Sequence, residues 1–316
     1  MNTVKVTCVE KGVLLNKAFQ FNFPVEYTEY EQLSQQQFYD QVHDQDVLII
    51  SDLKVDEKIL DHNPNLKLLA LCSTGYDHVD IELLKSRNIK ICNIRGYAGD
   101  AVAEHAFVLM MNLIKNFDSQ VKAVRDGTWS NSPVSFYLAA PIRELKNKNL
   151  VIVGKGEIGQ SLAEKAQAFG MKVIFSERKH ATTCREGYVP FTQAIQLADV
   201  LSLHCELNDE TRYMIDRTVL SQMKKDSILI NVGRGGLIHS EDVAEALTNQ
   251  QIAGFGADVL DQEPPAADHP LLKLKHPNVM ITAHIAWATD EAQERLFSIL
   301  ENNVNQNILG HDQNLV

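Results

Sequence analysis

The chain has 316 residues, of which 45% are apolar and 22% charged; this composition is typical of globular proteins, and the length allows two domains. Its formal net charge of −11 argues against nonspecific binding to nucleic acid or to anionic membranes. No apolar run approaches the roughly 20 residues that a membrane-spanning helix needs.

The cysteine pattern and the first residues of the chain indicate in which cellular compartment the protein works. Cys8, Cys72, Cys92 and Cys205 lie in or beside apolar runs, and no Cys-x-x-Cys pair occurs, so we expect reduced thiols. The residues after Met1 form a strand-like pattern without the layout of a signal peptide. These features predict a cytoplasmic protein.

Short apolar runs alternate with stretches of helical spacing in the first part of the chain. The runs that predict buried parallel strands are Val4–Val9, Val47–Ile50, Leu66–Leu71 and Ile89–Cys92. From Ala101 to Ile114 the apolar residues become dense and helical in spacing, which predicts a long, largely buried helix. The segment Gly127–Leu145 contains aromatic residues and prolines without a clear period, and we interpret it as an arm of the kind that packs on a second subunit.

The apolar run Val151–Val153 ends in a Gly-x-Gly-x-x-Gly pattern, which occupies Gly154–Gly159. Apolar residues then recur at helical spacing from Ile158 to Phe169, and a second apolar run, Met171–Phe175, leads to Glu177. A strand, a glycine-rich turn, a helix and a second strand ending in an acidic residue together indicate a dinucleotide-binding site.

The glycines and the acid have separate tasks in such a site. Gly154 permits the tight turn, Gly156 lets the backbone approach a pyrophosphate, and Gly159 lets helix and strand pack closely. The helix that follows directs free N–H groups and its positive dipole end toward the phosphates. Glu177 would accept hydrogen bonds from both ribose hydroxyls, which favours NAD, although Arg178 beside it leaves NADP open.

The same glycines have two other interpretations. One is an ordinary glycine-rich turn between a strand and a helix. The other is a nucleotide-triphosphate loop, but that motif needs a lysine before Ser161, and this chain has Gln160 there. We therefore favour a dinucleotide site and reject the triphosphate loop.

Strand and helix patterns continue to alternate after the glycine-rich turn. The further apolar runs are Val173–Phe175, Val200–Leu203, Ile228–Ile230, Ile252–Phe255 and Val279–Ile281. This alternation predicts an α/β fold with two doubly wound, Rossmann-like parallel-sheet domains. We expect the last helix, Asp290–Leu309, to return to the first domain. A dinucleotide domain, residues 99–285, would then be inserted into a flavodoxin-like substrate domain made of residues 1–98 and 286–316.

Polar residues that follow predicted strands are candidates for a reactive site, because ligands of open parallel sheets bind beyond the carboxyl ends of the strands. Arg234 lies between Gly233 and Gly235 after the run Ser227–Ile230. Its guanidinium suits a planar carboxylate and can also donate to an adjacent carbonyl oxygen. A surface arginine on a turn is the alternative interpretation.

The later loops supply acids and a histidine. Asp258 lies at a strand end, where it would accept an N–H from the carboxamide of nicotinamide. Glu263 precedes two prolines, which restrict it to an extended conformation; a proline-rich loop with incidental acids is the alternative. His284 follows a third strand, and histidine suits proton transfer because its pKa lies near neutrality.

Together these side chains suit the oxidation of a 2-hydroxy acid. His284 would take the hydroxyl proton while hydride goes to nicotinamide. A carboxylate against its far ring nitrogen would fix the tautomer, raise the pKa and keep His284 protonated for the reverse reduction. In the loop Ser73–Asp77, Gly75 and the neighbouring N–H groups could bind the substrate carboxylate, or form a plain turn. No spacing typical of a metal site is present.

Over essentially its whole length the chain resembles the D-isomer-specific 2-hydroxyacid dehydrogenases. The resemblance is carried by Ser73–Asp80, Tyr97, Val102–His105, Gly154–Gly159, Asn231–Gly235, Asp258–Pro264 and His284–Trp287. It implies that Arg234, Glu263 and His284 are the catalytic trio, and that Gly75 and Tyr76 contact substrate through backbone atoms, together with Arg234 and His284. The expected cofactor contacts are Val102, Gly154, Lys155, Gly156, Glu157, Ile158, Gly159, Glu177, Arg178, His204, Thr211, Val232, Gly233, Asp258 and Ala286.

Within the family, the segments Ser73–His78 and His284–Trp287 look most like those of glycerate dehydrogenases and of hydroxypyruvate or glyoxylate reductases. One alternative is a D-lactate-type dehydrogenase with a larger pocket. Another is an NAD(H)-sensing protein similar to the C-terminal-binding-protein corepressors, which carry additional disordered segments. Members are usually homodimers joined through the dinucleotide domain. We therefore expect a homodimer with a small-molecule substrate, and no nucleic-acid or membrane partner.

Overall fold

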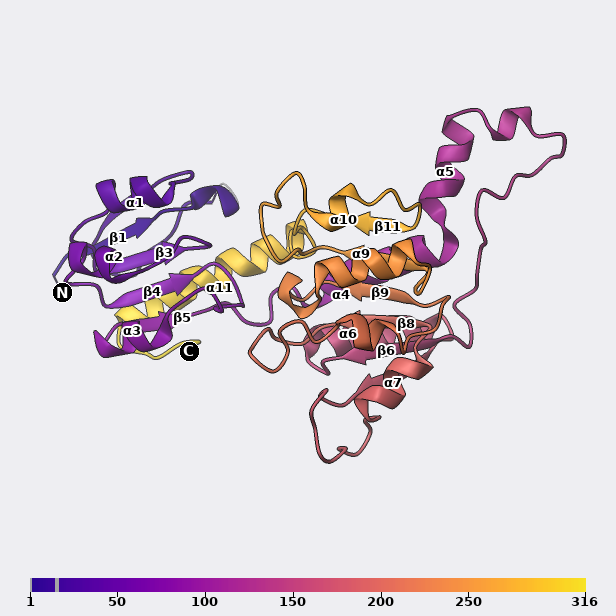
Figure 1. Ribbon diagram of the computed structural model, residues 1–316. Helices are drawn as coiled ribbons and strands as arrows, with labels where there is room; N and C mark the ends of the chain where they lie inside the picture. The colour runs from indigo at the N-terminus through magenta and orange to yellow at the C-terminus, as the bar shows by residue number, and fades with distance from the viewer. Residues whose placement is uncertain (1, 15–16) are drawn as a thin grey trace. The chain divides into compact units, whose positions relative to one another are not determined.

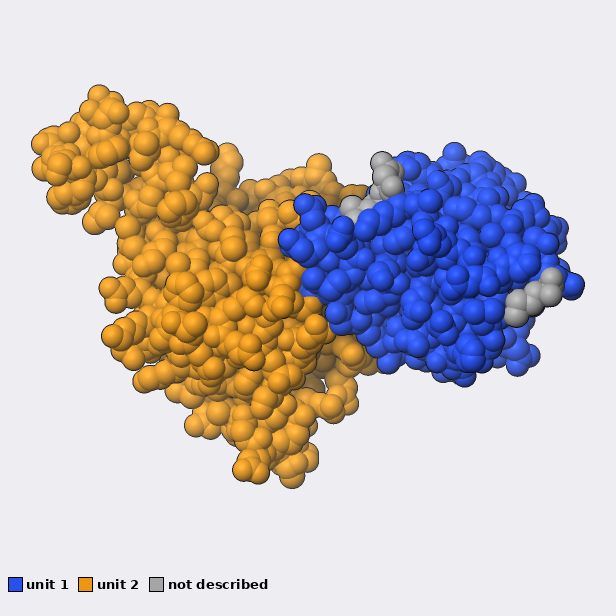
Figure 2. Space-filling model, turned by 180° about the vertical axis from the view of Figure 1, so that it is seen from behind, with its two compact units in different colours: residues 1–98, 288–316 blue, residues 99–287 orange. Residues whose placement is uncertain are grey.

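The computed structural model describes residues 2–14 and 17–316 (Figure 1). These residues form two compact units (Figure 2). Unit 1 comprises the chain up to Ala98 together with Ala288–Val316, and unit 2 comprises Gly99–Trp287. No helix in this described part of the chain is long and apolar enough to cross a membrane.

Unit 1 is built on a five-stranded parallel sheet with the strand order β2-β1-β3-β4-β5. The strands are β1 Val4–Cys8, β2 Val25–Glu29, β3 Val47–Ile50, β4 Leu68–Leu71 and β5 Lys90–Cys92. The helices are α1 Gln35–Gln41, α2 Glu57–His62, α3 Ile81–Ser86 and α11 Asp290–Ile308. This strand order is that of flavodoxin-like sheets, which confirms the predicted architecture.

Burial explains which strands of unit 1 the sequence predicts. Every residue of β3 and β4 is buried, as in a parallel sheet covered on both faces, and both strands fall within predicted apolar runs. The edge strand β2 alternates between half-buried and exposed residues and follows Pro24. It lacks a continuous apolar run, so the sequence pattern did not predict it.

The C-terminal helix α11 belongs to unit 1, where it packs against β4 (Figure 1). It begins after Thr289, whose hydroxyl accepts a hydrogen bond from the N–H of Ala292 and so caps the helix. Unit 2 is therefore an insertion between two parts of unit 1, as the sequence pattern predicts.

Unit 2 is built on a six-stranded parallel sheet with the order β11-β10-β9-β8-β6-β7. The strands are β6 Asn149–Val153, β7 Lys172–Ser176, β8 Val200–Leu203, β9 Ile228–Asn231, β10 Gly254–Ala257 and β11 Val279–Ile281. The helices are α4 Gly99–Lys115, α5 Phe117–Arg125, α6 Glu157–Ala168, α7 Phe191–Leu197, α8 Arg217–Leu220, α9 Ser240–Thr248 and α10 Pro270–Lys273.

A single parallel bridge extends this sheet beyond β7. It joins Ser176 to Val189, which occupies the place of one further strand. With that bridge the sheet has the strand order of dinucleotide-binding domains, and β6 lies where the order reverses. Ligands of such sheets bind at this reversal, beyond the carboxyl ends of the strands.

The position of β10 corrects one sequence prediction. Its strand was expected at Ile252–Phe255, but it lies two residues later, at Gly254–Ala257. A Cβ on Gly256 would lie 2.9 Å from the Leu113 side chain and 3.0 Å from that of Ile230, so glycine allows α4 to pack closely on β10. The glycines interrupt the apolar pattern, and Ile252 is buried in the preceding turn instead.

The helix predicted at Ala101–Ile114 is α4, which packs on β9, β10 and α6. It ends at Asn116, whose positive φ of 47° breaks the helical path before α5. After α5 an arm formed by residues 126–145 extends away from the sheet of unit 2 (Figures 1 and 2). Its exposed apolar side chains are Trp129, Val134, Phe136, Tyr137, Leu138 and Ile142.

Candidate active site

Three loops of unit 2 bring together polar residues that are far apart in the sequence. The strands β9, β10 and β11 are neighbours in the sheet and parallel, so their carboxyl ends lie at one edge. The loop after β9 carries Arg234, the loop after β10 carries Asp258 and Glu263, and the loop after β11 carries His284. This edge is where parallel α/β sheets bind ligands.

His284 and Glu263 form a direct pair at this edge. The imidazole Nδ1 lies 2.6 Å from the carboxylate Oε2 of Glu263, and Glu263 Oε1 accepts the N–H of Leu260 at 2.7 Å. Each partner thus has a fixed orientation. The His284 side chain keeps 45% of its surface exposed, so its other ring nitrogen can reach a ligand.

The contact between His284 and Glu263 shifts the pKa of both side chains. The hydrogen bond to Glu263 raises the pKa of His284, while burial and the positive charge of Arg234 oppose the rise. Burial would raise the pKa of Glu263, but the hydrogen bonds from His284 and from the Leu260 N–H, with the charge of Arg234, hold that pKa below its ordinary value. Glu263 is therefore ionised at neutral pH, and His284 holds a proton more firmly than an isolated histidine.

Asp258 fixes the turn that presents His284. The backbone φ of His284 is 56°, in the left-handed region that non-glycine residues rarely adopt. The N–H of His284 donates to the backbone oxygen of Asp258 at 2.8 Å. The buried Asp258 carboxylate accepts the N–H groups of Ile285 at 3.0 Å and Ala286 at 2.8 Å, and the hydroxyl of Thr282 at 2.5 Å.

The loop after β9 is shaped around Arg234. The Asn231 side chain donates to the carbonyl oxygen of Arg234 at 2.9 Å and accepts the N–H of Gly233 at 3.2 Å. A Cβ on Gly235 would lie only 1.9 Å from the carbonyl carbon of Leu260, so no side chain fits there. Glycine at this position lets the loops after β9 and β10 lie against each other, which brings Arg234 toward Glu263.

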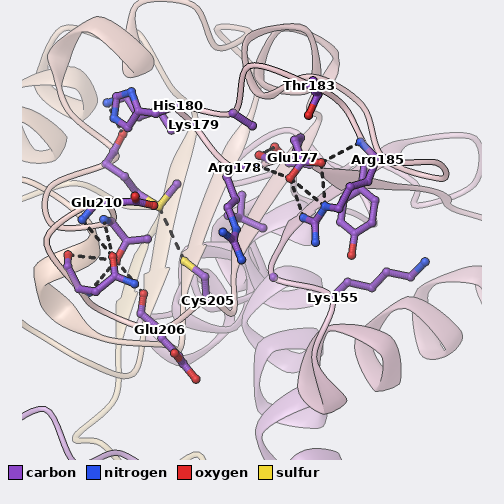
Figure 3. A pocket seen from close by; sticks show the side chains of 18 of the residues that line it. Lys155, Glu177, Arg178, Lys179, His180, Thr183, Arg185, Cys205, Glu206 and Glu210 are labelled. Carbon is purple, nitrogen blue, oxygen red and sulfur yellow. Dashed lines mark hydrogen bonds and ion pairs between the residues drawn. The ribbon is translucent and has the colours of Figure 1, made fainter.

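A second feature of the sheet edge is a cavity of about 660 Å³ beside the glycine-rich turn (Figure 3). This volume lies within the roughly 300–1,000 Å³ of small-molecule sites. The cavity is bordered by the carboxyl ends of β6 and β7 and by the loop after β8. Of the expected cofactor residues, those that line it are Gly154, Lys155, Glu177, Arg178 and Thr211.

Two glycines of the turn lie against backbone atoms, and the third faces open space. Gly154 has a φ of 104°, and a Cβ there would lie 2.5 Å from the carbonyl oxygen of His204. A Cβ on Gly159 would lie 2.1 Å from the carbonyl oxygen of Gly154, so the helix α6 packs directly on the turn. Nothing lies within 4 Å of a Cβ on Gly156, which leaves the N-terminus of α6 open to a phosphate group.

The other expected cofactor residues lie outside the cavity lining. Val232, Gly233, Asp258 and Ala286 follow β9, β10 and β11, next to the His284–Glu263 pair. The rest lie in α4, at the start of α6 or directly after β8, and these are Val102, Gly156, Glu157, Ile158, Gly159 and His204. The expected contacts thus form two groups along one sheet edge.

His204 is the most strongly perturbed histidine of unit 2. Burial lowers its pKa to about 4, so its ring is neutral at physiological pH. Its Nε2 lies 2.7 Å from the hydroxyl of Ser202, and its buried Nδ1 has no hydrogen-bond partner among the described residues. The ring directly follows β8, whose loop borders the cavity, and it adds no charge there.

The contacts of two residues at this edge, Arg185 and His105, were not predicted from the sequence. Arg185 pairs with Glu177 across the cavity rim, and His105 on α4 lies 2.8 Å from the hydroxyl of Thr282 and 3.6 Å from the Asp258 carboxylate. The motif Val102–His105 could have drawn attention to His105. No pattern in the sequence marks Arg185, which lies in an irregular loop.

The expected substrate-contacting residues Gly75 and Tyr76 lie in unit 1, in the loop after β4. The hydroxyl of Ser73 donates to the carbonyl oxygen of Gly75 at 2.7 Å, and the carbonyl oxygen of Tyr76 accepts the N–H of Val79 at 3.0 Å. This loop is an ordered turn at the carboxyl end of a strand, as in unit 2. Arg234, Glu263 and His284 all lie within unit 2.

Residues 107–286 match the family model described as the NAD-binding domain of D-isomer-specific 2-hydroxyacid dehydrogenases. The chain is 35% identical to a glycerate dehydrogenase of Methylorubrum extorquens over 99% of both chains. It is 38% identical to a glyoxylate reductase of Thermococcus litoralis, covering 82% of this chain and 78% of the relative. A crystal structure of a Thermus thermophilus protein superposes with a TM-score of 0.84 and 29% identity, over 99% of this chain and 100% of that one.

The family match spans more than half of the chain, including the glycine-rich turn and all three candidate catalytic side chains. The similarity to whole relatives extends it to both units. Together with the two parallel sheets and the open helix N-terminus at Gly156, these matches support an NAD(P)-binding protein. The chain belongs to the family of D-isomer-specific 2-hydroxyacid dehydrogenases.

Proposed function

We propose that this protein transfers hydride between NAD(P) and C2 of a small D-2-hydroxy acid, reducing hydroxypyruvate or glyoxylate and oxidising D-glycerate. The observation that carries the proposal is the pair His284–Glu263, held 2.6 Å apart at the same sheet edge as Arg234 and the glycine-rich turn. A proton donor with a raised pKa beside a guanidinium suits the reduction of a 2-oxo acid.

Each member of the trio has one role in this proposal. The nicotinamide, when bound, supplies or accepts the hydride. His284 gives its proton to the carbonyl oxygen during reduction and takes it back from the hydroxyl during oxidation. Glu263 orients and tunes His284, and Arg234 holds the substrate carboxylate and polarises the carbonyl group. The backbone of Gly75 and Tyr76 would supply further contacts to the substrate.

We assign cofactor binding to one unit and the substrate domain to the other. Residues 99–285 would bind the cofactor, and residues 1–98 with 286–316 would form the substrate domain. The N-terminus of α6 would hold the pyrophosphate, and the cavity at Glu177 and Arg178 would hold the adenosine half. Asp258 Oδ2 accepts one hydrogen bond within the protein, so a lone pair remains for the carboxamide.

The proposed substrates are supported by the chemistry of the reaction and by the names of similar proteins. Oxidation of D-glycerate at C2 yields hydroxypyruvate, so one enzyme catalyses both directions, and the similar proteins include a glycerate dehydrogenase and a glyoxylate reductase. A panel of 2-oxo acids assayed with NADH and NADPH tests the proposal. Faster turnover of pyruvate than of hydroxypyruvate would favour a D-lactate-type enzyme. Cofactor binding without turnover of any acid would favour a sensing protein.

The hydrogen bond between His284 and Glu263 predicts how the reduction rate depends on pH. In Glu263→Gln a neutral amide replaces the carboxylate, so the pKa of His284 falls. Reduction needs protonated His284, so its rate is full below that pKa and lost above it. The alkaline limb of the kcat/KM profile should therefore move to lower pH.

The same substitution should cost less rate, at its own optimum pH, than the roughly 10²- to 10⁴-fold that a positioned proton donor contributes. Oxidation needs neutral His284, so the acid limb of its pH profile follows the same pKa. Because a neutral amide does not stabilise the imidazolium by charge, this limb should also move to lower pH. A profile that coincides with that of the wild type would show that the carboxylate does not tune His284.

We propose further that the protein is a homodimer joined through unit 2. The arm at residues 126–145 supports the proposal, because its apolar side chains are exposed. Exposed apolar patches usually mark protein–protein interfaces. Light scattering should give the mass of a dimer for the wild type and of a monomer for the double variant Phe136→Asp/Leu138→Asp. Leu272→Asp, on exposed α10, is the matched control and should stay dimeric. A monomeric wild type would contradict the proposal.

We also propose that the protein works in a reducing, cytoplasmic environment. All five cysteines are free thiols, and Cys8, Cys72 and Cys92 are buried among apolar residues. Burial raises the pKa of Cys8 and Cys92 to about 12, which keeps both thiols protonated and unreactive.

A further inference from the structure

The carboxylate of Glu177, expected to accept the ribose hydroxyls of the cofactor, is already occupied within the protein (Figure 3). Its Oε1 accepts the N–H of Arg178 at 2.9 Å and Arg185 Nη2 at 2.6 Å. Its Oε2 accepts the backbone N–H of Arg185 at 3.0 Å. The Arg185 Nε lies between the two oxygens, 3.1 Å from Oε1 and 2.8 Å from Oε2.

These four N–H groups, of which the Arg185 Nε–H is shared between both oxygens, match the roughly four lone-pair sites that a carboxylate offers. The Glu177 side chain is also only 5% exposed. No acceptor position is left for a ribose hydroxyl. Glu177 therefore serves in this structure as the anchor of Arg185, and its negative charge is neutralised at the cavity rim.

The anchored guanidinium is held on its other side as well. Arg185 stacks on the ring of Tyr188, with 4.0 Å between the guanidinium carbon and the ring centre. Hydrogen bonds from Arg185 and from the N–H of Arg178 lower the pKa of Glu177 to about 2, so the ion pair persists over the whole physiological pH range. The arrangement is a bidentate arginine–carboxylate fork, which is geometrically specific.

Further cations line the same cavity. Arg178 follows Glu177 directly and is exposed, and its guanidinium has no carboxylate partner among the described residues. Lys155 comes from the glycine-rich turn, whereas Lys179 is engaged by Asp216 at 3.1 Å and by the carbonyl oxygen of Met214 at 2.9 Å. The acids Glu206 and Glu210 also line the cavity, but in Figure 3 they lie on the side away from Arg185.

We propose that Arg185 determines cofactor choice: by occupying Glu177 it removes the group that would repel a 2′-phosphate, and Arg178 binds that phosphate, so that the protein uses NADPH as well as NADH. A free carboxylate at the end of the second strand would accept ribose hydroxyls and reject the phosphate, whereas an arginine nearby accommodates it. The inference rests on the proposed dehydrogenase function.

The experiment separates binding of the adenosine half from catalysis. Isothermal calorimetry compares 2′,5′-ADP, which carries the 2′-phosphate, with 5′-AMP, which lacks it. The wild type should bind 2′,5′-ADP about tenfold or more tightly than 5′-AMP, the value of a hydrogen bond to a charged group. Arg178→Ala should remove this advantage. Arg217→Ala is the control, because that exposed arginine pairs with Glu245 outside the cavity.

Arg185→Ala tests the role of the ion pair itself. The substitution frees the Glu177 carboxylate, so 5′-AMP should now bind more tightly than 2′,5′-ADP, and the kcat/KM ratio of NADPH to NADH should fall with it. The double variant Glu177→Ala/Arg185→Ala removes the repulsive charge and should restore most of the binding of 2′,5′-ADP. Restoration in the double variant also shows that the site still folds without Arg185.

Three outcomes overturn the inference. The first is a wild type that binds 5′-AMP and turns over with NADH but rejects 2′,5′-ADP; the proposed function would then stand alone. The second is an unchanged preference in Arg185→Ala. The third is a protein that binds neither nucleotide and turns over with neither cofactor, which would remove the proposed function as well.

Discussion

His284→Gln should reduce turnover of hydroxypyruvate with NADH by roughly 10²- to 10⁴-fold, the contribution of a positioned general acid. Glutamine keeps a polar side chain of similar reach but has no proton to give at neutral pH. The substitution should leave cofactor affinity nearly unchanged, because His284 does not line the cavity in which the adenosine half is proposed to bind. Steady-state kinetics measure the first effect, and quenching of protein fluorescence by NADH measures the second.

A second histidine beside a carboxylate provides the control. The Nδ1 of His239 lies 3.4 Å from Asp242 at the start of α9, and its ring contacts that of Tyr213. His239→Gln should therefore keep wild-type kinetics. Should His284→Gln retain more than a tenth of wild-type kcat over the whole pH range, another group must supply the proton.

Arg234→Ala should lower kcat/KM by roughly 10²- to 10⁴-fold, the value of two hydrogen bonds between charged groups. KM should rise and kcat should fall, because the guanidinium is proposed to hold the substrate carboxylate and to polarise the carbonyl group that accepts hydride. Loss of its positive charge also removes an influence that lowers the pKa of His284. The alkaline limb of the reduction profile should therefore move to higher pH, opposite to its shift in Glu263→Gln.

Arg234→Lys separates charge from geometry. Lysine restores the positive charge without the planar fork, so it should recover the position of the pH profile more fully than it recovers kcat/KM. The exposed Arg217, paired with Glu245, serves again as the control and should tolerate alanine. Near-normal kcat/KM in Arg234→Ala would reject the assigned role and with it the proposed arrangement of substrate.

Local patterns predicted much of the fold because they encode burial. Strands covered on both faces, such as β3 and β8, are fully buried and almost entirely apolar, and the structure places them at the predicted residues. The glycine-rich turn was equally readable, since Gly154 and Gly159 face backbone atoms that exclude any side chain. The edge strand β2 and the glycine-containing strand β10 were missed or displaced because neither buries a continuous apolar run.

Contacts between distant segments could not be read in the same way. The cofactor preference inferred from Glu177 assumed a free carboxylate, but Arg185, in an irregular loop, donates to both of its oxygens. The left-handed backbone of His284 likewise depends on hydrogen bonds to Asp258 from a different strand. Neither contact leaves a periodic signal in the sequence.

The amino-acid sequence by itself determined the two parallel-sheet units, the glycine-rich turn and the identity of Arg234, Glu263 and His284 as candidates, because apolar periodicity and residue chemistry are local properties. Only the tertiary structure decided that His284 and Glu263 meet at 2.6 Å and that Glu177 is occupied by Arg185. The physical reason is that hydrogen-bond geometry and charge neutralisation depend on which strand ends lie side by side, and strand order is set by packing of the whole sheet.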